Sequence, residues 1–266
     1  MKNEIKDVVW ITGASSGIGR ALALRMARAG YCVAATARRQ DALEALAREA
    51  EGRVLPVAAD TTDAASLAAA VTRIENQLGP IGIAVFCAGT YQALMGAELT
   101  AAKARPLFEL NFMGTVNALE AVLPGMIRRR KGRVAMVASL AGYFGLPTSA
   151  VYGASKAALI NMAEALRPDL ARSGIAVQIV NPGFVRTPLT DKNAFPMPFL
   201  MESADAAEAF YRGLHSNRFE ITFPRRFSLI LRLLQMLPYR LSLALTRLTV
   251  PKDRPTTDAP SVSRAS

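Results

Sequence analysis

Residues 8–19, VVWITGASSGIG, decide the fold of this chain. The first five residues form the short apolar run of a buried strand, and the glycines after it allow a tight turn into a helix. Such a turn lets backbone N–H groups approach a pyrophosphate at the positive end of the helix. We therefore predict a dinucleotide site at this turn, although glycine turns also join strands to helices in folds that bind no nucleotide. The contacts predicted here are Gly13, Ser15, Ser16, Gly17, Ile18 and Gly19.

The same alternation of short apolar runs and amphipathic stretches continues to residue 223. Strands are predicted at residues 8–12, 31–37, 54–58, 83–87, 133–138, 175–180 and 219–223. Helices are predicted at residues 17–29, 41–51, 63–78, 99–130, 151–172 and 204–215. Strands separated by helix-length segments require right-handed crossovers and a parallel sheet covered on both faces. The fold class is therefore α/β, a doubly wound parallel sheet of the Rossmann kind.

The 266 residues suit one large domain or two small ones, and the sequence shows no second domain. We predict a nucleotide-binding and catalytic domain at residues 1–223, a basic and apolar helical extension at 224–250, and a disordered tail at 251–266. Residues 181–201 hold four prolines and are expected to form a long loop.

The composition excludes several classes of function. Two cysteines and one histidine rule out a disulfide framework and a multi-histidine metal site, so no metal is expected. The net charge of +11 is compatible with phosphate ligands, an anionic membrane or nucleic acid. The basic cluster at 128–133 ends a predicted helix, where cations complement the dipole, and no nucleic-acid motif accompanies it. With neither a signal peptide nor a transmembrane run in the sequence, a cytoplasmic location is expected, or a peripheral one on the inner membrane surface.

The end of the second predicted strand indicates which dinucleotide is preferred. An acidic residue there would bind the ribose 2′-hydroxyl of NAD(H). This chain instead has Arg38 and Arg39, whose guanidinium groups suit the 2′-phosphate of NADP(H). We predict NADP(H) as the preferred cofactor, with NAD(H) left open. The alternative is that both arginines only form a solvated start of a helix.

Tyr152 and Lys156 lie one helical turn apart on one face of the predicted helix. A nearby cation favours the phenolate and is expected to lower the pKa of Tyr152, which suits proton exchange with a carbonyl or alcohol. Ser139 precedes this pair by thirteen residues. Together with the glycine turn, this spacing resembles the short-chain dehydrogenase/reductase family from about residue 8 to residue 223.

The resemblance implies roles for individual residues. Tyr152 would be the catalytic acid or base, Lys156 would lower its pKa and bind the nicotinamide ribose, and Ser139 would hydrogen-bond the substrate carbonyl. Asn111 would be the fourth catalytic residue, supporting a relay water beside the lysine. Further cofactor contacts implied by the family are Asp60, Thr61, Ala88, Gly89, Pro182, Gly183, Val185 and Thr187. Taken singly, Ser139, Asn111 and Asp60 also fit a turn residue, a satisfied helix amide and a helix cap.

One position departs from the family pattern, because Cys87 stands where an asparagine usually ties neighbouring strands together. Cysteine is a small and weakly hydrogen-bonding residue, so we expect that link to be lost at a cost in stability rather than catalysis. A reactive thiol is not expected at the end of a buried strand.

The substrate is predicted to be a small apolar carbonyl compound or alcohol. Tyr143, Phe144 and Phe184 fall in segments that line the substrate cleft in the family, with simple mutual packing as the alternative. Residues 224–250 combine apolar faces with arginines spaced seven or eight apart, interrupted by Pro238. This pattern fits a peripheral membrane contact and a helical pair packed on the fold or a partner subunit equally well.

The sequence thus favours an NADP(H)-dependent oxidoreductase that interconverts a carbonyl and an alcohol. The resemblance also implies a homodimer or homotetramer, built on the long helices that begin near residues 99 and 151. The alternative function is a catalytically silent nucleotide-binding protein with a regulatory or membrane-docking role.

Overall fold

The computed structural model describes residues 7–191 and 196–250. Its strands form one parallel sheet in the order β3-β2-β1-β4-β5-β6-β7, which confirms the predicted doubly wound fold. The strands are β1 (Val8–Thr12), β2 (Val33–Ala37), β3 (Val54–Ala58), β4 (Ile81–Phe86), β5 (Gly132–Val137), β6 (Ile175–Pro182) and β7 (Glu220–Phe223). The strand order reverses between β1 and β4, where α/β sheets of this kind bind ligands.

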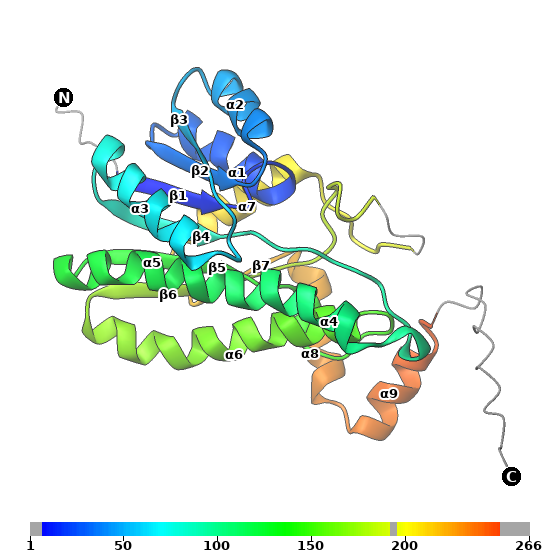
Figure 1. Ribbon diagram of the computed structural model, residues 1–266. Helices are drawn as coiled ribbons and strands as arrows, with labels where there is room; N and C mark the ends of the chain where they lie inside the picture. The colour runs from blue at the N-terminus through cyan, green and yellow to red at the C-terminus, as the bar shows by residue number, and fades with distance from the viewer. Residues whose placement is uncertain (1–6, 192–195, 251–266) are drawn as a thin grey trace, which may run out of the picture.

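Helices cover both faces of the sheet (Figure 1). They are α1 (Gly17–Arg28), α2 (Gln40–Glu49), α3 (Ala64–Leu78), α4 (Ala101–Phe108), α5 (Gly114–Arg129), α6 (Ala150–Arg172), α7 (Ser203–Leu214), α8 (Arg225–Met236) and α9 (Tyr239–Arg247). One hydrophobic core joins the sheet to α1, α2 and α7, and a second joins the opposite face to α3, α5 and α6. Because β1 is buried on both sides, its successive side chains enter alternate cores: Trp10 enters one, while Val9 and Ile11 enter the other.

The predicted helix at residues 99–130 is interrupted near its middle. α4 passes into a π-helical turn, Glu109–Met113, before α5 begins. Such turns are rare and often occur at functional sites, because they redirect one side chain within a continuous helix. Here the turn carries Asn111, which is fully buried.

The C-terminal extension forms the helices α8 and α9, and Pro238 separates them as predicted. α8 packs next to β7 and buries Ser228 and Leu231. Packing on the fold is therefore confirmed for one face of this helix. In Figure 1, α8 lies near the ends of α4 and α6, and α9 projects farther from the sheet. Within the described part of the chain, no helix has the length and apolar character needed to cross a membrane.

Candidate active site

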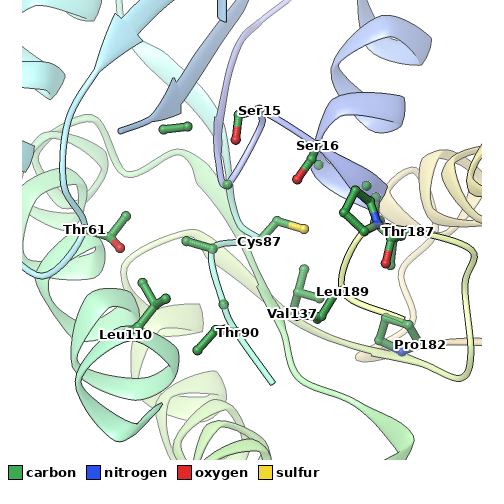
Figure 2. Close-up of a pocket in the computed structure, with 18 of the residues that line it drawn as sticks. Ser15, Ser16, Thr61, Cys87, Thr90, Leu110, Val137, Pro182, Thr187 and Leu189 are labelled. Carbon is green, nitrogen blue, oxygen red and sulfur yellow. The ribbon is translucent and has the colours of Figure 1, made fainter. Parts of the chain in front are cut away.

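A cavity of about 360 Å³ lies at the carboxyl edge of the sheet, around the point where the strand order reverses (Figure 2). All the residues that the sequence predicts for a dinucleotide line it. These are Gly13, Ser15, Ser16, Gly17, Ile18, Gly19, Arg38, Arg39, Asp60, Thr61, Ala88, Gly89, Tyr152, Lys156, Pro182, Gly183, Val185 and Thr187. Sequence reasoning missed smaller lining residues such as Thr90, Leu110 and Val137, which carry no motif of their own.

The turn after β1 packs closely against itself and against the loop after β4, so that two of its positions require glycine. Gly13 has a φ of +67°, and a Cβ added there would lie 2.7 Å from the backbone of Ala88. A Cβ at Gly19 would lie 2.6 Å from the carbonyl oxygen of Gly13. The side chain of Ser16 does not cap α1, and the first turn of α1 holds no acidic residue. The N-terminus of α1 therefore faces the cavity with its positive dipole end available to an anion.

Positive charge gathers where the adenosine end of a dinucleotide would lie. Arg38 and Arg39 follow β2, line the cavity and are exposed. The carboxylate of Asp60 accepts hydrogen bonds from the backbone N–H (3.0 Å) and the hydroxyl (2.9 Å) of Thr62. These bonds and the nearby Arg38 lower the pKa of Asp60. The predicted alternative of a helix cap is wrong for Asp60, because Asp63 caps α3 by accepting from the backbone N–H groups of the helix.

Ser139, Tyr152 and Lys156 meet at the inner end of the cavity. Ser139 lies just beyond β5, and the other two side chains come from the first turns of α6. The ammonium of Lys156 donates to the carbonyl oxygen of Val137 at 2.9 Å and lies 5.7 Å from the ring centroid of Tyr152. The hydroxyl of Ser139 also accepts a hydrogen bond from the backbone N–H of Ala141 at 3.1 Å. Ser139 therefore stabilises the turn after β5 and lines the cavity as well.

The pKa of Tyr152 differs from the prediction. Burial of the phenol raises this pKa to about 12, although a hydrogen bond with Ser139 lowers it in part. Burial likewise lowers the pKa of Lys156 to about 8. The expected lowering of the tyrosine pKa by the lysine is therefore wrong for this structure, because loss of water destabilises the phenolate more than its neighbours stabilise it. At neutral pH Tyr152 is a neutral phenol, which is the form that can donate a proton.

Asn111 lies behind the cavity rather than on its wall. Its side-chain amide donates to the carbonyl oxygen of Thr90 and to the hydroxyl of Ser155, both at 3.0 Å. Its carbonyl oxygen accepts from the backbone N–H of Thr90 at 2.7 Å. A Cβ at Gly89 would lie 3.2 Å from the Asn111 oxygen and 3.4 Å from the Lys156 ammonium. Asn111 thus ties the loop after β4 to α6 through Thr90 and Ser155.

Cys87 occupies the end of β4 on the cavity wall, as Figure 2 shows. Burial raises the pKa of its thiol to about 11, which agrees with the expectation that it is not reactive. A link between the ends of β1 and β4 exists despite the missing asparagine. The hydroxyl of Thr12 accepts from the backbone N–H groups of Cys87 (3.2 Å) and Ala88 (3.3 Å).

A second and larger cavity, of about 760 Å³, adjoins the first. Its lining is mainly apolar, and it shares Ser139 and Tyr152 with the dinucleotide cavity. Phe184 lines it as predicted, but Tyr143 and Phe144 do not. The hydroxyl of Tyr143 instead donates to the carboxylate of Glu220, which draws the ring away from the cavity.

The sequence analysis missed much of the wall of this apolar cavity. α8 supplies six of the wall residues: Leu233, Met236 and a set of four, Phe227, Ile230, Leu231 and Leu234. Their spacing of i, i+3, i+4 and i+7 is that of one helical face, so the signal was present in residues 224–250. Tyr91 is a further wall residue, and its ring lies 5.0 Å from that of Tyr152 in an edge-to-face arrangement.

Comparison with known proteins agrees with this geometry. The family model for the short chain dehydrogenases matches residues 7–196. An uncharacterized oxidoreductase of Myxococcus xanthus is 39% identical over 231 residues, which cover 86% of this chain and 91% of that protein. A short-chain dehydrogenase from Streptomyces avermitilis superposes with a TM-score of 0.79 at 29% identity, covering 93% of this chain and 96% of that one.

A structure of a variant actinorhodin polyketide ketoreductase with NADPH has a TM-score of 0.75 at 26% identity, covering 84% of this chain and 97% of that one. The chain belongs to the short-chain dehydrogenase/reductase family. It is accordingly an NAD(P)-dependent oxidoreductase with a Rossmann nucleotide-binding fold.

Proposed function

We propose that this enzyme interconverts an apolar ketone or aldehyde and the corresponding alcohol, with NADP(H) as its preferred cofactor. One observation carries the proposal: Ser139 and Tyr152 belong to the walls of both cavities. A nucleotide in the first cavity and an apolar substrate in the second would therefore meet at these two hydroxyl groups.

The residues of the first cavity fit a phosphorylated dinucleotide. Glycines without room for a Cβ and the uncapped start of α1 suit the pyrophosphate. Arg38 and Arg39 suit a 2′-phosphate, whereas Asp60 already accepts two hydrogen bonds from Thr62. When bound, the nicotinamide exchanges a hydride with the substrate carbon. The NADPH-bound ketoreductase relative supports the choice of cofactor.

The chain's own side chains would handle the proton. Ser139 donates a hydrogen bond that orients the substrate carbonyl oxygen and polarises it. Tyr152 gives its proton to the same oxygen as the alcohol forms, and takes one back in the oxidation direction. Lys156 then faces a developing phenolate, which its positive charge stabilises. Reduction suits a neutral phenol, which can give up a proton, and burial raises the pKa of Tyr152 still further above neutral pH.

Consumption of NADPH with a series of aliphatic and aromatic ketones tests this function. Tyr152→Phe is expected to lower kcat about 10²- to 10⁴-fold, the usual contribution of a general acid, and to change NADPH affinity far less. Tyr91→Phe is the matched control, since it also removes one phenol oxygen from the apolar cavity. Turnover that survives in Tyr152→Phe would contradict the assigned role.

A protein that binds NADPH but reduces none of these ketones would favour the silent nucleotide-binding alternative. The predicted homodimer or homotetramer also remains a proposal, supported by exposed apolar residues on and beside α4 and α5, namely Leu99, Phe108, Met113 and Ile127. An apolar substrate of the proposed kind partitions into lipid, which fits the membrane contact that the sequence of residues 224–250 suggests.

A further inference from the structure

The α8–α9 hairpin, residues 225–247, exposes many apolar side chains, and its second helix also buries polar ones. In α9, Ser242 is fully buried and Thr246 is 8% exposed. On the same helix Leu241 is 56% and Leu248 is 81% exposed. A helix that only covered the domain would turn its leucines inward, because burial of apolar surface drives such packing. The exposed leucines therefore indicate a surface that contacts a partner outside the domain.

Several of the exposed apolar residues form a row on each helix, while others, such as Ile230 and Leu243, lie outside these rows. The rows are Leu229, Leu233 and Met236 on α8, and Leu241, Leu245 and Leu248 on α9, all between 49% and 81% exposed. Each row follows the i, i+4, i+7 spacing of a single helical face. Scattered apolar residues on a surface need no explanation, but rows of this kind mark an interaction site. Leu233, Met236 and Leu245 also line the apolar cavity, so the rows reach its rim.

Unpaired cations accompany these rows. Residues 224–250 hold five arginines and no acidic residue. Arg232 pairs with Glu220, whereas the other four are exposed and form no ion pair among the residues that the structure describes. Arg240 and Arg247 immediately precede Leu241 and Leu248, so an arginine row runs beside the leucine row on α9. Arginines beside an apolar face are the arrangement of helices that lie in a membrane interface.

We propose that the α8–α9 hairpin docks on the surface of an anionic bilayer and that apolar substrate passes from the lipid into the adjoining cavity. The second half of this statement rests on the proposed function, and the first half does not. Charge favours a bilayer over a second copy of the chain. A two-fold contact through this face would bring the same unpaired arginines of both copies together, with no acidic residue in the segment to offset them. Anionic headgroups provide that complement.

Co-sedimentation of the full-length protein with vesicles tests the docking without any need for catalysis. Vesicles of phosphatidylcholine and phosphatidylglycerol in equal amounts should bind the protein, and vesicles of phosphatidylcholine alone should bind it far more weakly. Arg240→Gln/Arg247→Gln should weaken partitioning about thirtyfold, since both cations lie at the charged surface. Arg48→Gln/Arg73→Gln removes the same charge from exposed positions on α2 and α3 and should have little effect.

A triple variant, Leu229→Ser/Leu241→Ser/Leu248→Ser, tests the apolar rows at positions that do not line the cavity. It should lose vesicle binding and keep the wild-type rate on a water-soluble ketone. Its rate on a long-chain ketone carried in the anionic vesicles should fall in proportion to the lost binding. Equal loss on both ketones would overturn the delivery of substrate from lipid.

Three results would overturn the docking itself. One is an absence of sedimentation with the anionic vesicles. Another is binding that neither the arginine nor the leucine variants reduce. The third is a concentration-dependent dimer in light scattering that the leucine triple variant abolishes while vesicle binding stays absent, which would assign the rows to a second copy.

Discussion

Replacing Arg38 with alanine should weaken NADPH binding selectively. Arg38 follows β2 and lines the dinucleotide cavity, and its positive charge helps to lower the pKa of Asp60, which lines the same cavity. A charge-assisted hydrogen bond contributes about 1.5–3 kcal/mol, which corresponds to about a 10- to 150-fold change in Kd. Because the side chain is exposed, solvent screening favours the lower part of that range. The affinity for NADH, which lacks the 2′-phosphate, should change by less than about twofold on the same reasoning.

The assay is fluorescence or calorimetric titration of both nucleotides into wild type, Arg38→Ala and Arg39→Ala. Arg48→Ala is the matched control, since it removes one charge from an exposed site on α2 outside the cavity. The preference for NADPH should also shrink as salt is added, because the site is open to solvent. Equal loss of NADPH and NADH affinity in Arg38→Ala would refute recognition of the 2′-phosphate. So would an unchanged NADPH affinity in both cavity variants.

Three further predictions follow from burial and backbone geometry. Burial lowers the pKa of Lys156 from 10.5 to about 8, so the unfolded chain binds a proton that the folded one lacks between these values. Urea unfolding should show stability rising with pH across that window by up to about 3 kcal/mol, and Lys156→Met should lack the rise. Iodoacetamide at neutral pH should alkylate the exposed Cys32 and spare Cys87, whose thiol pKa is about 11, as mass spectrometry would show; early labelling of Cys87 would contradict the raised pKa of its thiol. Gly13→Ala should cost about 1–3 kcal/mol more in urea unfolding than Gly52→Ala, because both have positive φ but only Gly13 lacks room for a Cβ.

Local patterns were sufficient to predict most of the fold and the nucleotide cavity. The turn after β1 needs glycines for reasons that act over a few residues, and Tyr152 and Lys156 share one helical face whatever surrounds them. The residues of the dinucleotide cavity follow strands of one parallel sheet, whose carboxyl ends meet at one edge. Their assembly therefore follows once the strand order is known.

Features that depend on distant contacts were predicted less well. Tyr143 was predicted to line the substrate cleft, but its hydroxyl donates a hydrogen bond to Glu220 on β7. These two residues are 77 positions apart in the sequence. The pKa of Tyr152 is raised because other elements exclude water from it, and neighbouring residues in sequence do not reveal that exclusion. The helical spacing of Phe227, Ile230, Leu231 and Leu234 is visible in the sequence. Only the folded structure shows that this face of α8 lines the apolar cavity.

The two cavities share part of their walls, but different segments of the chain form most of each cavity. This division has an evolutionary consequence. The family model matches residues 7–196, whereas much of the apolar wall comes from α8, residues 225–236. Mutations in that terminal segment can reshape substrate choice while the inherited nucleotide machinery stays intact. Exchange of residues 225–250 between homologues is accordingly expected to change substrate preference while nucleotide binding is kept.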